Sequence, residues 1–246
     1  YTTAHTLSLH DALPIFKFSI YLNLLNNHHI YIYMKCVVSG STGLVGKSLI
    51  NILSKDNEVI ALTRREYKFP ENVKQLLVDY DNEFIIPKAD HLFICLGYPL
   101  KLLELIKMNA SVKQDFYKVD FELVYRLAKK AKKIGIENLS VVSAVGANQQ
   151  SANYYLKIKG EMEKNLINLD FRNLNIYQPS HLLGERDNPI DLSVKIFEGI
   201  TKVTGNLLFG SLAKFKNVEV DDIANLMAKN SYKKNKGVNY FNTMDV

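Results

Sequence analysis

The stretch that decides the fold is Lys35-Cys36-Val37-Val38-Ser39, followed directly by Gly40-Ser41-Thr42-Gly43-Leu44-Val45-Gly46. The first five residues are typical of a buried strand, and the glycines, spaced GxxGxxG, open a helical pattern. Gly40 would make the tight turn, Gly43 would let the backbone approach a pyrophosphate, and Gly46 would let the helix pack close to the strand. Free N–H groups at the start of such a helix favour an anion. The stretch therefore predicts a dinucleotide site.

From Met34 onward, short apolar runs alternate with helical periods, which is typical of a parallel sheet covered by helices. Strands are expected over residues 35–39, 58–62, 74–78, 91–95, 138–143 and 173–177. Helices are expected over residues 44–55, 114–134, 152–168, 190–203 and 221–230. The pattern predicts one α/β domain over residues 34–246 with a doubly wound, Rossmann-like parallel sheet. Any substrate-side region would be small and lie within residues 181–246.

Residues 1–33 differ in composition from the rest of the chain. They contain no Met and no Gly, and they hold four of the six His. The run YTTAHTLSLHDALPI resembles a translated sequencing adapter, so we expect residues 1–33 to be a non-native or disordered leader and the native protein to start at Met34. The apolar run 13–25 is interrupted by Pro14, Lys17 and Asn23, which does not favour a signal peptide or membrane anchor.

The composition narrows the class of protein. The chain has 246 residues, 47% hydrophobic, with a net charge of +6. The Lys residues are scattered over expected helix faces, which favours solvated surfaces over a nucleic-acid site. Cys36 and Cys95 lie in separate apolar runs, which favours a reducing compartment over a disulfide framework. We expect a cytoplasmic protein, because no credible export signal is left once the leader is set aside. No CxxC motif or Cys/His cluster is present, so no metal site is expected.

The residues that follow three further expected strands predict which nicotinamide cofactor the protein binds. Strand 58–62 ends in Thr63-Arg64-Arg65, where an NAD enzyme usually has an acidic residue. A guanidinium group can bind a 2′-phosphate through paired hydrogen bonds, which favours NADP(H) over NAD(H). Arg64 follows the strand more closely, although both arginines could simply be exposed. Further along the chain, Asp79 and Tyr80 and then Leu96 and Gly97 close two strands, and we expect them beside the cofactor.

A candidate catalytic set follows the fifth strand. Ser143 ends that strand, and Tyr155 and Lys159 follow at a spacing of i, i+4, which places phenol and ammonium on one helical face. The ammonium, together with an oxidised nicotinamide, would lower the pKa of Tyr155. Tyr155 could then exchange a proton with a carbonyl oxygen that Ser143 holds by a hydrogen bond. Lys159 would also hold the nicotinamide ribose. The alternative is a helix Tyr packed on the sheet and a solvated Lys.

Taken together, the motifs SGSTGLVG, ALTRRE, FICLG, KVDFELVYRLAKKAKKIG, VVSAVGA, YYLKIKGEME and YQPSHLLGER resemble the short-chain dehydrogenase/reductase superfamily. Within it, the chain is similar to the atypical, Tat-interacting-protein-like NAD(P)H-binding oxidoreductases. The resemblance implies a Rossmann-like domain, bound NADP(H), and reductase roles for Ser143, Tyr155 and Lys159. It also implies that the loop at Pro179, Ser180 and His181 passes beside the nicotinamide.

Two positions depart from the pattern of that superfamily. Asp120 stands where many members have Asn, and it could support a proton relay or only the fold. Gln178 stands where similar proteins usually carry Arg, which removes a positive charge near the site. In addition, the leucine-rich run 99–108 could form a lid over the substrate or a helix that covers the sheet edge.

Two functions remain open at this point. The first is an NADP(H)-dependent oxidoreductase that acts on a small carbonyl or alcohol substrate through Ser143, Tyr155 and Lys159. The second is a catalytically silent regulator that senses NADP(H) and binds a protein partner, and an epimerase or dehydratase is a third option. Neither nucleic acid nor a membrane is expected as a partner, and the chain could be a monomer or a homodimer.

Overall fold

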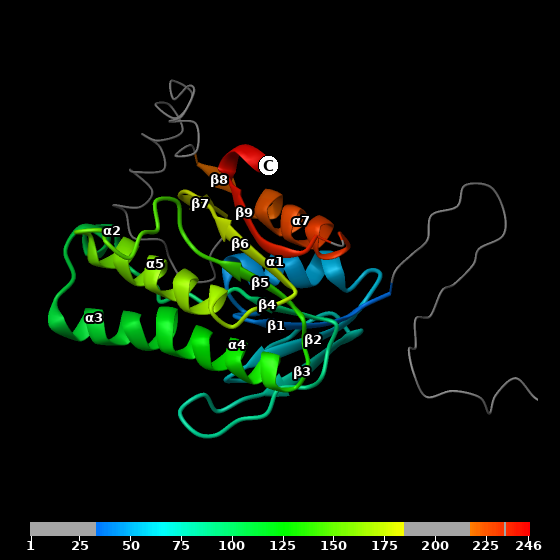
Figure 1. The fold of residues 1–246 in the computed structure, drawn as a ribbon. Helices are drawn as coiled ribbons and strands as arrows, with labels where there is room; N and C mark the ends of the chain where they lie inside the picture. The colour runs from blue at the N-terminus through cyan, green and yellow to red at the C-terminus, as the bar shows by residue number, and fades with distance from the viewer. Residues whose placement is uncertain (1–32, 185–216, 234) are drawn as a thin grey trace, which may run out of the picture. The chain divides into compact units, whose positions relative to one another are not determined.

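A computed structural model describes residues 33–184, 217–233 and 235–246 of the chain. Its main sheet has seven strands in the order β3-β2-β1-β4-β5-β6-β9, and each neighbouring pair is parallel (Figure 1). The strands are β1 Lys35–Ser39, β2 Glu58–Thr63, β3 Val73–Leu77, β4 His91–Ile94, β5 Asn138–Val142, β6 Asn173–Gln178 and β9 Gly237–Asn242. The chain runs outward from β1 in both directions, so the predicted doubly wound, Rossmann-like sheet is confirmed.

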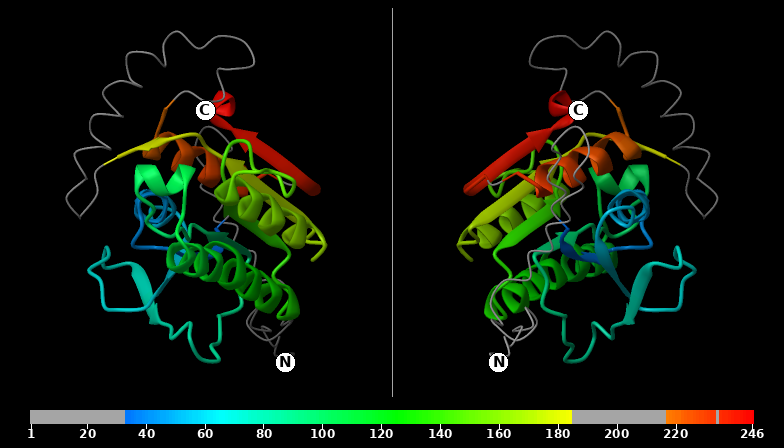
Figure 2. Two further views of the ribbon diagram at one scale, coloured as in Figure 1. Left: turned by 90° about the vertical axis from the view of Figure 1, so that its left-hand side faces the viewer. Right: turned by 90° about the vertical axis from the view of Figure 1, so that its right-hand side faces the viewer.

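Helices cover both faces of this sheet (Figures 1 and 2). One face carries a long helix, formed without a break by α3, the π-helical segment η1 and α4, and also α5; the other carries α1 and α7. Their bounds are α1 Leu44–Leu53, α3 Ala110–Tyr117, η1 Lys118–Leu123, α4 Val124–Lys133, α5 Tyr154–Ile167 and α7 Val220–Ser231. The carboxyl ends of the strands, where the loops carry most of the predicted site residues, therefore lie at one edge of this layered structure.

The main core lies between the sheet and the helices α4 and α5. It contains alternate residues of the strands, such as Val37, Leu92 and Leu139, and the inward side of the helices, such as Leu127 and Met162. All five side chains are buried and apolar. A strand covered by helices on both faces has no side that is exposed to solvent. This packing fixes the strand ends, and thus the loops that follow them.

The opposite face of the sheet, under α1 and α7, contains buried polar residues. Ser140 of β5 pairs in register with Asn175 of β6, and His91 Nε2 lies 2.9 Å from Ser140 Oγ. Both His91 and Asn175 are almost fully buried. This polar row is not predicted from the sequence, since each residue lies singly within an apolar run.

The expected strands and helices agree with the observed ones within a few residues wherever the structure describes the chain. Three strands were not expected: β9, and the two-residue strands β7 Leu182–Leu183 and β8 Val218–Glu219, which pair with each other. β9 was missed because it is an edge strand with a largely exposed pattern. The leucine-rich run forms a short helix, α2 Leu102–Ile106, and a 3-10 turn, η3 Thr243–Asp245, ends the chain. The helix expected over 190–203 lies outside the described residues.

Met34–Val246 forms one compact unit of the structure. That this unit is one NAD(P)-binding domain with a small substrate-side region stays a prediction. The expected leader lies outside the described residues except for residue 33. Among the helices that the structure describes, none is both long enough and apolar enough to cross a membrane.

Candidate functional site

The glycine turn between β1 and α1 has a geometry that only glycine satisfies at two positions. Gly40 has a φ of +76°, and a Cβ there would lie 2.3 Å from the carbonyl oxygen of Cys95. A Cβ on Gly46 would lie 2.2 Å from the carbonyl oxygen of Gly40. At Gly43 the nearest atom, Gly40 O, would be 3.3 Å away, so the requirement is weaker. The backbone of the turn is thus pressed against β4 on one side and α1 on the other.

Side chains next to the glycine turn hold it against neighbouring elements through hydrogen bonds. Ser41 Oγ donates to Leu62 O at 2.8 Å, and Ser39 Oγ lies 3.1 Å from Tyr80 Oη. Val45 is buried, whereas Leu44 is partly exposed and Thr42 is exposed. Of the predicted residues 40–46, the side chains of Ser41 and Val45 therefore serve the fold, and their contribution to a ligand would come from the backbone.

Arg64 and Arg65 both lie exposed directly after β2. Burial raises the pKa of Tyr80, and the positive charge of Arg64 acts in the opposite direction, which places Arg64 near the Ser39–Tyr80 contact. Arg65 contributes its carbonyl oxygen to Gln75 Nε2, at 2.9 Å. That Arg64, rather than Arg65, binds the cofactor stays a prediction.

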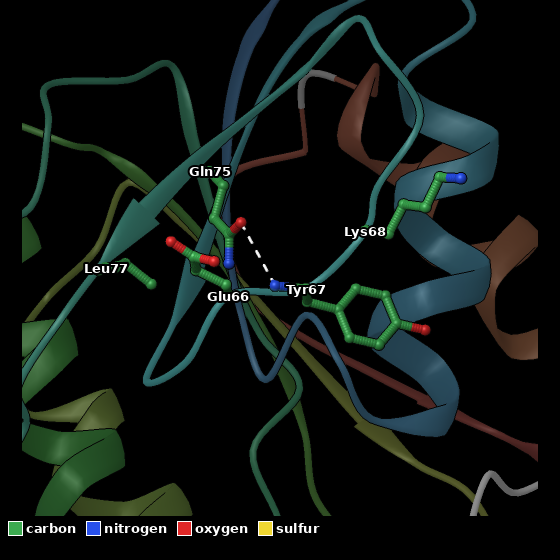
Figure 3. Close-up of a pocket in the computed structure, with 5 residues that line it drawn as sticks. All are labelled: Glu66, Tyr67, Lys68, Gln75 and Leu77. Carbon is green, nitrogen blue, oxygen red and sulfur yellow. Dashed lines mark hydrogen bonds between the residues drawn. The ribbon is translucent and has the colours of Figure 1, made fainter.

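A pocket of about 540 Å³ lies beside these arginines (Figure 3). Its lining comes from the segment after β2 and from β3: Glu66, Tyr67, Lys68, Gln75 and Leu77. The ring of Tyr67 lies next to α1, with Lys47 Nζ 5.2 Å from its centroid. This pocket could not be predicted from the sequence, because its residues come from two separate and mostly exposed segments.

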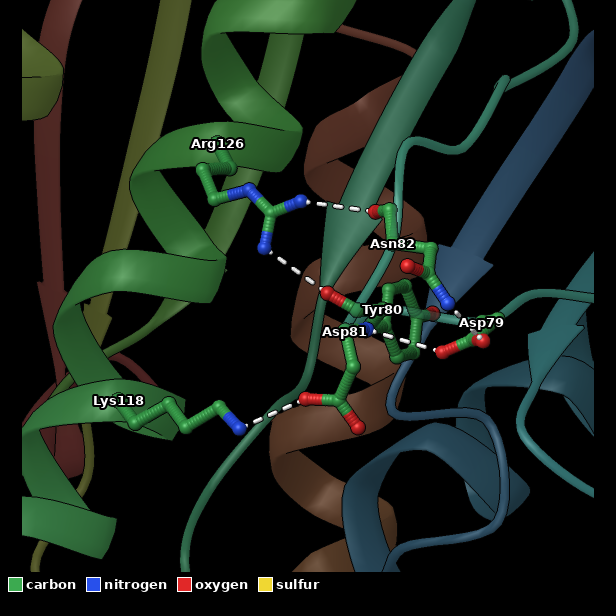
Figure 4. Close-up of polar contacts among 6 residues, drawn as sticks. All are labelled: Asp79, Tyr80, Asp81, Asn82, Lys118 and Arg126. Carbon is green, nitrogen blue, oxygen red and sulfur yellow. Dashed lines mark hydrogen bonds and ion pairs between the residues drawn. The ribbon is translucent and has the colours of Figure 1, made fainter.

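The turn after β3 holds Asp79 and Tyr80 (Figure 4). Asp79 is exposed and accepts hydrogen bonds from Asp81 N and Asn82 Nδ2, which lower its pKa. The ring of Tyr80 is buried and packs edge-on against Phe84, so this side chain belongs mainly to the core. We expected Tyr80 to lie beside the cofactor. Only its hydroxyl lies near the glycine turn, where it contacts Ser39.

Two cationic side chains that the sequence did not single out hold the turn after β3 against the long helix formed by α3, η1 and α4. Arg126 of α4 donates to Tyr80 O at 2.8 Å and to Asn82 O at 3.0 Å, and Lys118 of η1 lies 2.6 Å from Asp81 (Figure 4). Their positions on the helix gave no signal because their partners are mainly backbone carbonyls, which any residue can supply.

The loop after β4 is joined to the catalytic candidates through Asp120. Asp120 is almost fully buried in η1; its Oδ2 accepts from Tyr98 N at 2.7 Å, and its Oδ1 lies 2.7 Å from Lys159 Nζ. A Cβ on Gly97 would lie 4.0 Å from the same carboxylate, whereas Leu96 packs against the main core. The π-helical turn that carries Asp120 is a feature often found at functional sites. Asp120 therefore braces both the loop and Lys159.

Tyr155 and Lys159 lie on one face of α5, as predicted. Their surroundings, however, shift the pKa of Tyr155 in the direction opposite to the expected one. Burial alone would lower the pKa of Lys159, but the Asp120 carboxylate, with a smaller effect from Tyr155, raises it. Burial raises the pKa of Tyr155; Lys159 acts to lower it, and Asp120 offsets part of that effect. The ring of Tyr155 packs 5.4 Å from that of Phe116. The expected lowering by Lys159 is thus outweighed in the protein alone.

Ser143 lies at the end of β5 with its hydroxyl directed to a residue that the sequence reasoning missed. Its Oγ donates to Glu163 Oε1, and Gln178 Nε2 lies 2.9 Å and 3.1 Å from the two carboxylate oxygens. Glu163 lies one turn after Lys159 on α5 and is buried. The i, i+4 spacing from Lys159 is the signal that could have identified it.

The loop after β6 is tied to its surroundings by backbone hydrogen bonds. Pro179 O accepts from Val145 N at 3.0 Å, and His181 O accepts from Val218 N at 3.1 Å. Ser180 N donates to Thr243 Oγ1 at 3.2 Å. These bonds position the loop next to the end of β5, and they engage Pro179 O, Ser180 N and His181 O.

Comparison with known proteins finds relatives from several organisms that are named FMP52 or FMP52-1. A 32% identical relative, "Protein FMP52, mitochondrial" from Debaryomyces hansenii, matches over 192 residues, 74% of this chain and 80% of its own length. The protein of the same name from Saccharomyces cerevisiae is 35% identical over 63% of this chain and 68% of its length. "Protein FMP52-1, mitochondrial" from Scheffersomyces stipitis is 30% identical over 82% and 91%. No family model matches the chain.

Solved structures share the fold at low sequence identity. MoeE5 in complex with UDP-glucuronic acid and NAD has a TM-score of 0.64 at 13% identity, covering 84% of this chain and 75% of that one. The human epimerase family protein SDR39U1 with NADPH has a TM-score of 0.56 at 15% identity, covering 85% and 74%. These neighbours agree with the resemblance to the atypical short-chain dehydrogenase/reductase superfamily at the level of the fold.

One expectation is overturned by the relatives. The lack of a credible export signal favoured a cytoplasmic protein, but the relatives are named as mitochondrial. The inference failed because the lack of an export signal argues against secretion and does not distinguish between compartments inside the cell. With a 32% identical relative covered over 80% of its length, the chain belongs to the FMP52 family.

Proposed function

We propose that the chain is an NADP(H)-dependent oxidoreductase that acts on a small carbonyl or alcohol compound. The observation that carries the proposal is the glycine turn: at Gly40 and Gly46 a Cβ would collide with backbone, while Gly43 is exposed above the start of α1. Such a turn at a helix start fits a pyrophosphate. The names of the relatives support a mitochondrial location.

The residues around the turn fit the rest of such a cofactor. Arg64 is exposed and near Tyr80, so its guanidinium could bind a 2′-phosphate. Asp79 follows β3, on the outer side of β2, and Gly97 follows β4, on the side of Lys159. When bound, the nicotinamide cofactor supplies or accepts the hydride. Lys159 would hold its ribose, and the loop of Pro179, Ser180 and His181 would flank its ring.

The catalytic candidates would then transfer a proton and hold the substrate oxygen in place. Tyr155 would give a proton to the substrate oxygen during reduction and take it back during oxidation. Ser143 would hold that oxygen by a hydrogen bond once its hydroxyl leaves Glu163. Because burial raises the pKa of Tyr155 in the protein alone, the phenol form is favoured, which suits reduction more than oxidation.

A second function, an NADP(H)-sensing binding protein, is favoured by one observation. Lys159 is neutralised by Asp120 at 2.7 Å, and the hydroxyl of Ser143 is committed to Glu163. A site in which both groups are occupied could bind nucleotide without performing chemistry. The sensor and the enzyme share the prediction of cofactor binding, so binding is tested first.

Calorimetric titration of the full chain with NADPH and NADH tests the cofactor. We expect tighter binding of NADPH by at least about 10-fold, or about 1.4 kcal/mol. Arg64→Ala should remove this preference, because it deletes the guanidinium beside the 2′-phosphate. Arg172→Ala, an exposed arginine just before β6, is the matched control and should change nothing. Equal affinity for both nucleotides refutes the NADP preference, and binding of neither refutes both functions.

Tyr155→Phe separates the enzyme from the sensor. It removes the phenolic oxygen and keeps the ring that packs on Phe116, so nucleotide binding should persist. Turnover of a carbonyl substrate found by screening should fall by about 100-fold or more, the usual contribution of a positioned acid. If the variant reduces that substrate at the parent rate, Tyr155 is not the proton donor.

A further inference from the structure

Glu163 is a buried carboxyl group outside the predicted catalytic set, yet it contacts a member of that set. Only 6% of the residue is exposed. Oε1 accepts the hydroxyl proton of Ser143, and Gln178 Nε2 lies within 3.1 Å of both carboxylate oxygens. Ser143 is itself held at its backbone, since its N–H donates to Tyr177 O at 2.7 Å. The contact between Ser143 and Glu163 is therefore fixed by the strands β5 and β6.

The hydrogen-bond donors to Glu163 carry no charge. Gln178 supplies an amide, which gives hydrogen bonds to both carboxylate oxygens without a counter-charge. The nearest ammonium, Lys159, is paired with Asp120 at 2.7 Å and is thus largely neutralised. A buried carboxylate without its own cation is costly, so its protonated form is favoured relative to that of an exposed Glu.

Other groups that act on Glu163 come from α5 and β9. In the described part of the chain they are Lys159, whose charge favours the carboxylate, and Tyr240, whose pKa is raised by burial and, to a smaller extent, by the charge of Glu163. Burial raises the pKa of Glu163, and the hydrogen bonds from Gln178 and Ser143 and the charge of Lys159 only partly offset this. Asp120 of η1 acts on Lys159 and so weakens the last of these effects.

We propose that Glu163 is a positioning residue that decides where the hydroxyl proton of Ser143 is donated. When Glu163 is ionised, it accepts that proton, and Ser143 has none to give to a substrate oxygen. When Glu163 holds a proton, its own O–H donates to Ser143 Oγ, and Ser143 donates outward. The outward acceptor is the carbonyl oxygen of the proposed reduction, and in this respect the inference rests on the proposed function.

The ionisation of Glu163 can be observed directly by ¹³C NMR of the full chain, labelled at the glutamate carboxyl carbons. We expect one carboxyl signal to titrate at a clearly higher pH than the others. Glu163→Gln should remove it. Glu161→Gln is the matched control, because Glu161 lies on the same helix, is partly exposed and pairs loosely with Lys157 at 3.9 Å. That variant should remove a different carboxyl signal and leave the signal of Glu163 in place.

The coupling to Ser143 is tested with the Cβ signal of that residue. It should shift with the same midpoint as the Glu163 carboxyl and become independent of pH in Glu163→Gln. Gln178→Arg supplies the missing cation and should lower both midpoints by at least about one pH unit. This variant keeps Glu163, so it tests the proposal even if Glu163→Gln fails to fold. Titration of Glu163 with the ordinary glutamates, or an unmoved Ser143 signal, overturns the proposal.

These measurements require neither cofactor nor substrate, so their result is separate from that of the nucleotide titration. If nucleotide binding is absent, the proposed function fails while the proton coupling can still be found. Once a carbonyl substrate is known, the acid limb of kcat/KM should move with Gln178→Arg in the direction of the NMR midpoint. An equal loss of activity at every pH would show that Gln178 only supports the fold, and would contradict the inference.

Discussion

The glycine turn and the polar face of α5 both lie at the carboxyl ends of strands, and they depend on different physics. At the turn, Gly40 and Gly46 act by having no side chain, and backbone atoms of neighbouring elements occupy the space. On α5, Lys159 and Glu163 are both buried, and their protonation depends on partners from other elements. The turn is therefore a matter of local backbone geometry, while the α5 face is a matter of tertiary pairing.

Removal of Asp120 should have the largest effect on the α5 face. Asp120→Ala leaves Lys159, of which only 5% of the side chain is exposed, without its partner, and it leaves Tyr98 N without an acceptor. Breaking a buried pair from one side costs about 4 kcal/mol. Urea unfolding of parent and variant measures this loss.

A second substitution distinguishes a stranded charge from lost packing. In Asp120→Ala with Lys159→Met, no charge remains to be buried, so most of the lost free energy of unfolding should return. If the double variant is as unstable as Asp120→Ala or worse, the pair acts through packing and hydrogen bonding, and the contrast drawn with the turn is wrong.

The turn should respond to a single methyl group. Gly46→Ala would bring Cβ within 2.2 Å of Gly40 O, so α1 must move, and we expect a loss of about 3 kcal/mol together with nucleotide binding. Gly135→Ala is the control: its φ of +82° is similar to that of Gly40, but no atom lies within 4 Å. It should cost only about 1 kcal/mol of backbone strain. Similar losses in both variants, measured by thermal unfolding, would show that close approach is not what requires Gly46.

The same contrast explains how far the sequence could be interpreted. Strands such as β1 and β2 and the helix α1 are predicted correctly because hydrophobic periodicity and glycine spacing are local properties. β9 is missed because an exposed edge strand lacks the apolar pattern of its neighbours. The cytoplasmic expectation was wrong because the lack of a credible export signal does not distinguish between compartments inside the cell.

For the candidate site, the sequence predicts which residues occur but not which residues they meet. Ser143, Tyr155 and Lys159 were identified from their spacing, and Tyr155 and Lys159 do share a face of α5. The pairing of Lys159 with Asp120, and of Ser143 with Glu163, could not be predicted, because each partner comes from an element distant in sequence. The pKa of Tyr155 is raised, against expectation, mainly because the phenol is buried, and Asp120 adds a smaller effect in the same direction.

His91 extends the comparison to the sheet, because it is also a buried titratable group with a neutral partner, Ser140. Burial lowers the pKa of His91 to about 3. An unfolded chain binds a proton at this residue below a pH of about 6.5, and the folded chain does so only near 3. The unfolded state is therefore favoured as the pH falls through this window. Between pH 7 and pH 5 we expect His91 alone to remove about 2 kcal/mol of stability.

His91→Asn measures this contribution, because Asn keeps a polar group near Ser140 and does not titrate. Urea unfolding at the two pH values should show a smaller loss in the variant than in the parent, by about 2 kcal/mol. The carboxyl groups contribute equally to both proteins and cancel in the difference. An identical pH dependence in the two proteins would mean that His91 gains a proton in the folded state at an ordinary pH. In that case burial without a counter-charge would not be sufficient to shift a group in this protein, and the argument for Glu163 would lose its physical basis as well.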